Sequence, residues 1–308
     1  MTPFQRYIAE EIAVDHADGL LTRREALRRL GLLGLTLTAA SSLLAACANE
    51  NGSPATPSAT PGATSDTPAP TSPVAPPGSA DAVATEAITF PGPDGRTLQG
   101  AWAPAADPRG AVLVVHENKG LNDHIRSVAG RLAGAGYSAL AIDLLSEEGG
   151  TASFADPAQA TAALSTVPPQ RFSQDMRSGI DELTRRVPDR RIGAVGFCFG
   201  GGMTWLLLTT GDPRLAAAVP FYGPLPDGAD FAGSRAAVLA VYAELDQRVN
   251  ASRDAATAAL ERAGLVHEVV TYPGADHAFF NDTGPRYNAD AAAQAYDRML
   301  AWFGTHLG

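Results

Sequence analysis

Three residues in this sequence have the types and the chain order needed for nucleophilic catalysis. Cys198 lies in the stretch VGFCFGG, residues 195–201, which follows the G-x-S-x-G pattern of a nucleophile elbow with cysteine in the place of serine. Asp246 and His277 follow it along the chain. A histidine can take the proton of a thiol, and an aspartate can hold that histidine in the required tautomer. The three residues are therefore a candidate Cys-His-Asp triad.

The surroundings of Cys198 favour a reactive thiol. Glycines flank it at Gly196 and at 200–201, as the strained turn of an elbow between a strand and a helix requires. A helix that begins at Phe199 would direct its N-terminus at the sulfur and so favour the thiolate. The alternative is that Cys198 is only a small buried side chain, which is a common role of cysteine.

The acid of the triad has two candidates. Asp246 closes the strand-like run that ends in Glu244-Leu245, a position from which it could orient an imidazole ring. Asp276 is adjacent to His277 in the sequence and is poorly placed to bond its ring. We therefore prefer Asp246.

Alternating strand and helix patterns predict an α/β fold that would bring these residues together. Residues 111–115 are apolar without alternation, as expected for a strand buried on both faces. Further runs of this kind are separated by helical patterns, so βαβ crossovers and a mostly parallel sheet are expected. A β-hairpin of 87–90 and 97–103 precedes them. The other predicted strands are 138–142, 192–195, 216–220, 237–242 and 267–272, and the predicted helices are about 123–135, 157–165, 171–187, 200–210, 250–263 and 288–306.

The carboxyl ends of parallel strands meet at one edge of a sheet, where the active sites of such folds lie. The residues that follow the predicted strands are therefore the candidate site residues. They are His116-Glu117-Asn118, Asp143, Cys198, Tyr222, Asp246 and the loop Gly274-Ala275-Asp276-His277.

Residues from about 88 to 308 resemble the dienelactone hydrolase (carboxymethylenebutenolidase) family. The order nucleophile, acid, histidine is also that of the α/β-hydrolases. The resemblance implies a single α/β-hydrolase domain with helices on both faces of the sheet, and hydrolysis of lactones and esters by a Cys-His-Asp triad without a cofactor. It rests on the segments VVHE at 114–117, GY at 136–137 with DL at 143–144, GFCFGG at 196–201, ELD at 244–246 and GADHAF at 274–279.

The resemblance also implies roles for residues around the triad. In the family, a glutamate after the third strand contacts the nucleophilic thiol and takes part in forming the thiolate; here it matches Glu117. The oxyanion hole would be formed by the backbone N–H groups of Asn118 and Phe199. The candidate residues of the substrate pocket are Tyr222, Phe279 and Asn281.

One departure from the family pattern concerns the substrate. Members that cleave dienelactones carry an arginine shortly after the catalytic histidine, which holds the substrate carboxylate. This sequence has Asn281 where that cation would be. Arg171 or Arg177 could replace it, although a solvated helix face is the preferred place for both. The sequence therefore leaves open whether an anionic dienelactone is a substrate.

The N-terminal residues resemble an export signal. The stretch TRREALR, residues 22–28, is similar to the twin-arginine motif S-R-R-x-F-L-K. A mildly apolar run then ends in LAAC at 44–47, a sequence like a lipobox; the run is too short and weak for a membrane span of about 20 residues. We expect 1–46 to be a lipoprotein signal peptide and Cys47 to carry the lipid of an exported, membrane-anchored lipoprotein of the cell envelope. The alternative is an amphipathic cytosolic helix with an incidental cysteine.

The residues after Cys47 have the composition of a tether. Pro, Ser, Thr, Ala and Gly dominate residues 49–80, which cannot bury enough apolar surface to offset their ordering entropy. The predicted organisation is a signal peptide at 1–46, a lipid-anchored disordered linker at 47–83 and the hydrolase domain at 84–308.

The composition of the 308 residues limits the classes of partner that the protein is expected to bind. The chain is 45% hydrophobic and 18% charged, as expected for a globular α/β protein, and its net charge of −10 disfavours binding to nucleic acid. Two cysteines, one in the leader and one in the elbow, make a poor disulfide framework and a poor metal site. We expect a monomer without metal or cofactor, whose partners are a small ester or lactone and the membrane.

Three functions are consistent with the sequence. The preferred one is a hydrolase of small lactones or esters that works through a thioester intermediate. The alternatives are a catalytically silent α/β-hydrolase-fold lipoprotein that binds a ligand, and a structural surface lipoprotein.

Overall fold

The computed structural model describes residues 1–50 and 75–308, and the chain divides into two compact units, Met1–Ala75 and Pro76–Gly308. The larger unit contains all the strands of the described residues and the candidate triad. The smaller unit is helical in its described part.

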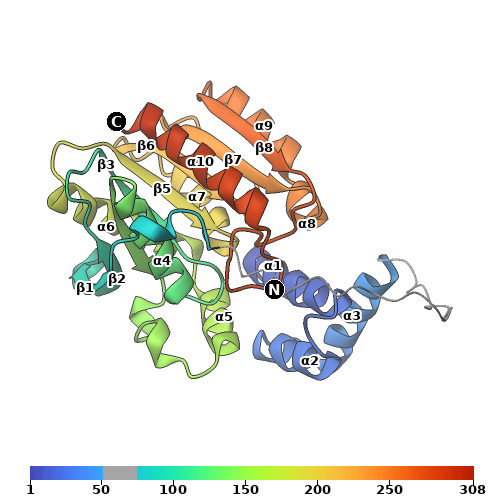
Figure 1. Ribbon diagram of the computed structural model, residues 1–308. Coiled ribbons are helices and arrows are strands. Elements are labelled where there is room, and N and C mark those ends of the chain that lie inside the picture. The colour runs from blue at the N-terminus through green and yellow to red at the C-terminus, as the bar shows by residue number, and fades with distance from the viewer. Residues whose placement is uncertain (51–74) are drawn as a thin grey trace, which may run out of the picture. The chain divides into compact units, whose positions relative to one another are not determined.

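An eight-stranded sheet forms the centre of the larger unit, with the strand order β1-β2-β4-β3-β5-β6-β7-β8 (Figure 1). β2 is antiparallel to β1 and to β4, whereas the strands from β3 to β8 are parallel to one another. The expected α/β fold with a mostly parallel sheet is confirmed. The strands are β1 (Glu86–Pro91), β2 (Thr97–Ala103), β3 (Gly110–Val115), β4 (Tyr137–Asp143), β5 (Ile192–Phe197), β6 (Leu215–Phe221), β7 (Ala237–Ala243) and β8 (His267–Tyr272).

Helices cover both faces of this sheet, with α4 and α10 on one face and α6 and α7 on the other (Figure 1). The Tyr296 hydroxyl of α10 donates a hydrogen bond of 3.0 Å to the Arg131 carbonyl oxygen of α4. Every residue of β3 is buried, which explains its uninterrupted apolar sequence. The helices are α4 (Asp123–Gly134), α5 (Pro157–Thr166), α6 (Pro169–Arg186), α7 (Phe199–Thr209), α8 (Gln247–Asn250), α9 (Arg253–Arg262) and α10 (Ala289–His306).

The predicted helix 250–263 is wrong at its start. The chain instead forms α8 and then α9, because Asp246 caps a separate short helix by accepting a hydrogen bond of 3.2 Å from the Val249 N–H. This cap holds the Asp246 side chain shortly after the end of β7.

The larger unit begins at Pro76, before the predicted domain start at residue 84, and residues 79–81 pack on α4. The Val83 N–H donates a hydrogen bond of 3.0 Å to the Gly130 carbonyl oxygen. A Cβ atom at Gly134 would lie 2.1 Å from the Asp81 carbonyl oxygen, so glycine is required for this approach. Of the predicted tether 47–83, residues 47–50 belong to α3, and residues 51–74 lie outside the described residues.

The described part of the smaller unit forms three helices: α1 (Pro3–Ala17), α2 (Arg23–Leu32) and α3 (Leu37–Glu50), which pack against one another. Thr2 and Gln5 form a capping box at the start of α1. The paired Arg23 and Arg24 open α2, and Cys47 lies within α3. These helices do not test whether the segment is an export signal, so the signal stays a prediction.

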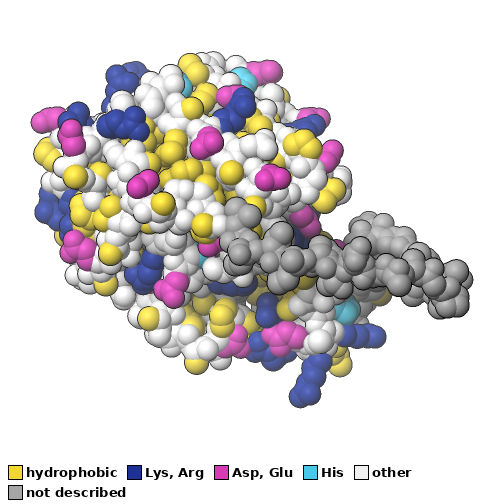
Figure 2. Space-filling model, in the orientation of Figure 1, with side chains coloured by type: hydrophobic (Ala, Val, Ile, Leu, Met, Phe, Trp, Pro, Cys, Tyr) yellow, Lys and Arg dark blue, Asp and Glu magenta, His cyan; other side chains and the backbone are white. Residues whose placement is uncertain are grey.

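Two general surface properties bear on function. Within the described residues, no helix has both the length and the apolar character that a membrane crossing requires. On the face shown in Figure 2, acidic and basic side chains are interspersed and do not gather by sign.

Candidate active site

The sheet register brings the predicted strand-end residues to one edge. Val115 of β3 pairs with Gly196 of β5, and Phe197 pairs with Phe221 of β6. Phe221 of β6 pairs in turn with Val241 of β7. The segments after these four parallel strands therefore begin side by side, and they carry Glu117, Cys198, Tyr222 and Asp246. The structure thus places the candidate site at the edge that the topology predicts.

Cys198 occupies a strained turn between β5 and α7. Its backbone has φ 55° and ψ −116°, a conformation that L-residues rarely adopt. Its N–H donates a hydrogen bond of 3.1 Å to the Phe221 carbonyl oxygen, which holds the turn against β6. A Cβ atom at Gly196 would lie 2.0 Å from the Gly200 carbonyl oxygen, so these glycines allow the turn to close. The strained turn expected of an elbow is present, and the role of Cys198 as the nucleophile stays a prediction.

Asp246 and His277 are paired in the structure. Asp246 Oδ2 lies 2.5 Å from His277 Nδ1, and both side chains are buried. The rival candidate, Asp276, bonds the His277 backbone N–H at 2.6 Å and forms an ion pair of 3.2 Å with Arg286. The preference for Asp246 as the partner of the imidazole ring therefore agrees with the geometry.

The electrostatics of this pair favour the charged states. Burial alone would lower the pKa of His277, but the Asp246 carboxylate and the thiolate form of Cys198 raise that pKa well above its ordinary value. Burial raises the pKa of Asp246, but His277 and Arg248 outweigh it and lower that pKa. Cys198 Sγ lies within 4.8 Å of a ring nitrogen of His277. The three groups are thus close enough to act on one another.

Glu117 is held by Asn281. The Asn281 Nδ2 group donates a hydrogen bond of 2.6 Å to Glu117 Oε2, and both residues are buried. Asn281 Oδ1 accepts from the N–H and the hydroxyl of Thr283, at 3.0 and 2.7 Å, so the orientation of the amide is fixed. Glu117 Oε1 is buried and has no hydrogen-bond partner among the described residues. Asn281, expected only as a pocket residue, therefore positions Glu117.

A buried cluster that the sequence did not indicate supports the loop of Asn281. The next residue, Asp282, lies 2.7 Å from His124 Nδ1 and forms a 3.6 Å ion pair with the buried Arg131. His124 and Arg131 are both residues of α4. No local pattern could have revealed this cluster, because its members are joined only by tertiary packing.

The other two candidate pocket residues differ in their surroundings. The Tyr222 ring meets the His277 ring edge to face, with centroids 5.3 Å apart, and the Tyr222 backbone is strained at φ 34°. Phe279 is buried among the rings of Phe221, Tyr222 and Tyr272. Tyr222 therefore lies beside the triad, whereas packing accounts for Phe279.

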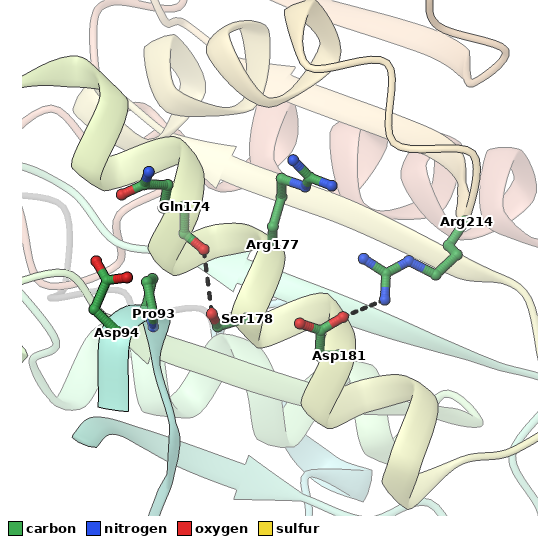
Figure 3. Close-up of a pocket in the computed structure, with 7 residues that line it drawn as sticks. All are labelled: Pro93, Asp94, Gln174, Arg177, Ser178, Asp181 and Arg214. Atoms are coloured by element: carbon green, nitrogen blue, oxygen red, sulfur yellow. Dashed lines mark hydrogen bonds and ion pairs between the residues drawn. The ribbon is translucent and has the colours of Figure 1, made fainter. Parts of the chain in front are cut away.

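The two arginines considered as anchors for a substrate carboxylate have other partners. Arg171 is mostly buried and forms a two-point ion pair with Glu148, at 2.6 and 3.0 Å, so the expectation of a solvated position is wrong for it. Arg177 is 3.5 Å from Asp212 and lines a shallow hollow with Arg214 and Asp181 (Figure 3). Arg214 directly precedes β6, so this hollow lies at the opposite end of that strand from the elbow.

The comparisons with known proteins agree with this geometry. The family model "Dienelactone hydrolase family" matches residues 99–307. The chain belongs to the dienelactone hydrolase family.

Relatives of this family are similar over most of their length. A putative carboxymethylenebutenolidase of Escherichia coli O157:H7 is 34% identical over 65% of this chain and 79% of its own. A putative carboxymethylenebutenolidase of Methylorubrum extorquens is 32% identical over 64% of this chain and 72% of its own length. The crystal structure of a putative dienelactone hydrolase from Klebsiella pneumoniae has 31% identity and a TM-score of 0.63, covering 72% of this chain and all of that one. These matches support a hydrolase that acts on lactones or esters, as expected.

Proposed function

We propose that the protein hydrolyses small, neutral carboxylic esters or lactones through a thioester on Cys198. The observation that carries the proposal is the paired Asp246 and His277 beside a cysteine in a strained elbow. In this reaction the thiolate attacks the carbonyl carbon and the imidazolium of His277 protonates the departing alcohol. Water, deprotonated by the then neutral imidazole, attacks the thioester carbonyl, so that the carboxylic acid leaves and the thiolate is restored beside the imidazolium.

The oxyanion of each tetrahedral intermediate would be held by the backbone N–H groups of Asn118 and Phe199. Asn118 follows β3, Phe199 opens α7 after β5, and these strands are neighbours in the sheet. The dipole of α7 would stabilise both the oxyanion and the thiolate.

The neutral substrate class is supported by the surroundings of two of the residues considered for holding a substrate carboxylate. Asn281 is uncharged and engaged with Glu117, and Arg171 is engaged with Glu148. A panel of p-nitrophenyl esters, simple lactones and a carboxylate-bearing dienelactone tests the proposal. We expect turnover of the neutral compounds that disappears in Cys198→Ala, and a lower kcat/KM for the anionic lactone. A preference for the anion would contradict the substrate class.

Glu117 is proposed to assist formation of the thiolate, and this role gives a prediction. Glu117→Gln should lower kcat/KM by about tenfold, or about 1.4 kcal/mol of barrier, because it removes the charge and keeps the shape. The melting temperature should change by only a few degrees, since Gln can still accept from Asn281. Steady-state kinetics and thermal unfolding measure both effects.

The matched control is Glu86→Gln, which neutralises an exposed glutamate of β1. It should change neither the kinetics nor the melting temperature. Full activity of Glu117→Gln together with a large loss of stability would show that Glu117 is structural.

We also propose that the chain is exported by a twin-arginine signal and anchored by a lipid on Cys47. Arg23 and Arg24 are exposed at the start of α2, so lysine at both positions should leave the helix intact and affect only recognition of the signal. The double variant should retain precursor in the cytoplasm, and Cys47→Ala should release or mis-anchor the protein. Fractionation with immunoblotting measures this, with the exposed Arg6→Lys as the control. Unchanged fractionation of both variants would contradict the proposal.

A further inference from the structure

His116 is a buried polar residue to which the proposed mechanism gives no task. It follows β3 directly and precedes Glu117, and its side chain is fully buried. A buried imidazole is costly unless both ring nitrogens have partners. Both nitrogens of His116 do have partners, and these partners determine where its proton lies.

The tautomer of His116 is fixed by a backbone amide. The Leu144 N–H lies 3.1 Å from His116 Nε2, and an amide N–H can only donate. Nε2 must therefore be the acceptor, which leaves the proton on Nδ1. Nδ1 in turn lies 2.7 Å from the Glu117 carbonyl oxygen, so it donates to that oxygen. Burial lowers the pKa of His116 although the Asp143 carboxylate opposes it, which keeps the ring neutral at neutral pH.

The acceptor of this hydrogen bond belongs to the peptide group whose N–H is that of Asn118. A trans peptide is planar, with its C=O and N–H pointing in opposite directions. Fixing the direction of the Glu117 carbonyl therefore fixes the direction of the Asn118 N–H. The Gly120 N–H, 3.2 Å away, provides a second donor to the same carbonyl oxygen. Donation to the carbonyl also polarises the peptide and strengthens its N–H as a donor.

The anchor on the far side of the ring is itself held firmly. Leu144 directly follows Asp143, the last residue of β4. The Asp143 carboxylate accepts from the N–H groups of Leu145 and Thr151, at 3.0 and 2.7 Å. The imidazole thus connects a fixed turn after β4 to the peptide that follows β3.

We propose that His116 is a positioning residue of the oxyanion hole, which aims the Asn118 N–H at the oxygen of the tetrahedral intermediate. The inference rests on the proposed function, because it concerns acyl transfer to Cys198. His116 acts through the peptide and does not touch the reacting atoms. Its effect should therefore appear in steps that develop an oxyanion and in no others.

Two substitutions in the full-length protein separate the two hydrogen bonds of the ring. His116→Asn places an amide N–H near the position of Nδ1 and can keep the bond to the Glu117 carbonyl. His116→Gln places an amide oxygen near the position of Nε2 and can keep only the bond from Leu144. We expect His116→Gln to lower kcat for p-nitrophenyl acetate by about 10- to 100-fold, since removing an oxyanion donor outright costs about 100- to 1000-fold. KM should change by less than about threefold, and His116→Asn should stay within about fivefold of wild type.

Alkylation of Cys198 by iodoacetamide separates this role from a merely structural one. A structural role of His116 would slow alkylation as well as ester turnover. Displacement at a saturated carbon forms no oxyanion, so both variants should be alkylated at the wild-type rate. Equal kcat in the two variants, or alkylation slowed in parallel with kcat, would overturn the inference. Ester turnover that survives Cys198→Ala would instead overturn the proposed function.

A measurement on the unaltered protein covers the case in which a variant fails to fold. Long-range ¹H–¹⁵N NMR distinguishes the two neutral tautomers of histidine. His116 should show a protonated Nδ1 and an unprotonated Nε2 at neutral pH. A proton on Nε2 would overturn the inference, because Nδ1 could then no longer donate to the Glu117 carbonyl.

Discussion

Cys198→Ala is expected to abolish ester hydrolysis, with kcat/KM reduced by about 1000-fold or more, because it removes the proposed nucleophile. Cys198 is small and lies in a turn whose shape is set by the neighbouring glycines, so alanine should preserve the fold. Thermal unfolding should confirm this. Turnover of p-nitrophenyl acetate, corrected for spontaneous hydrolysis, measures the effect.

Cys198→Ser is the matched variant of this experiment. It keeps the size of the side chain but replaces the thiol with an alcohol of far higher pKa, which the same surroundings are not tuned to ionise. We expect it to lose most of the activity and to retain more than Cys198→Ala.

The covalent intermediate can be located directly. Mass spectrometry after quenching with a slowly hydrolysed ester should find the acyl group on the peptide that contains Cys198. An acyl group on another residue, or full activity of Cys198→Ala, would refute the nucleophile and leave Cys198 a small buried residue in a tight turn.

The second large effect concerns the Asp246–His277 pair. His277→Ala should reduce kcat/KM nearly as much as Cys198→Ala, because members of a triad act as a unit. Asp246→Asn should cost less, about 10- to 100-fold, because the imidazole remains but loses its charged partner and its fixed tautomer. Steady-state kinetics across a range of pH distinguish the two variants.

The pH dependence of Asp246→Asn has a definite sign. Burial lowers the pKa of His277, whereas the Asp246 carboxylate raises it, with a net increase well above the ordinary value. The charged His277 of wild type should thus persist above the usual histidine range, and activity should fall only as the pH rises through this raised pKa. Asparagine removes the carboxylate and leaves the burial, so the alkaline limb of the kcat/KM profile should move to lower pH.

The free energy of unfolding should also depend on the protonation of His277. Because the folded-state pKa of His277 is raised, its contribution is fully present below the unfolded-state pKa and is lost as the pH rises through the folded-state value.

Asp276→Asn is the control for the pH profile, since this carboxylate bonds the backbone and Arg286 and not the ring. An alkaline limb that stays in place in Asp246→Asn, or moves equally in Asp276→Asn, would contradict the assigned acid.

The sequence by itself determined the elements and the strand ends that carry the candidate triad. Continuous apolar runs such as Gly110–Val115 and the glycines around Cys198 are local signals, because burial on two faces and a tight turn each restrict the residues at their own positions. The parallel topology then follows from the alternation of strands and helices, and it predicts a common edge for Cys198 and Asp246. The predicted helix 250–263 starts within the short helix α8, which Asp246 caps, whereas α9 itself begins at Arg253.

Only the tertiary structure decided which side chains hold the triad residues and their neighbours in place. The bond between Asn281 and Glu117 joins residues 164 positions apart, and the tautomer of His116 depends on an amide 28 positions away. Hydrogen bonds of this kind leave no periodic pattern, since each constrains two single positions whose separation is set by how the loops pack. The elbow can therefore be predicted from local sequence. The groups that position its neighbours come together only when the strands β3, β4 and β5 lie side by side.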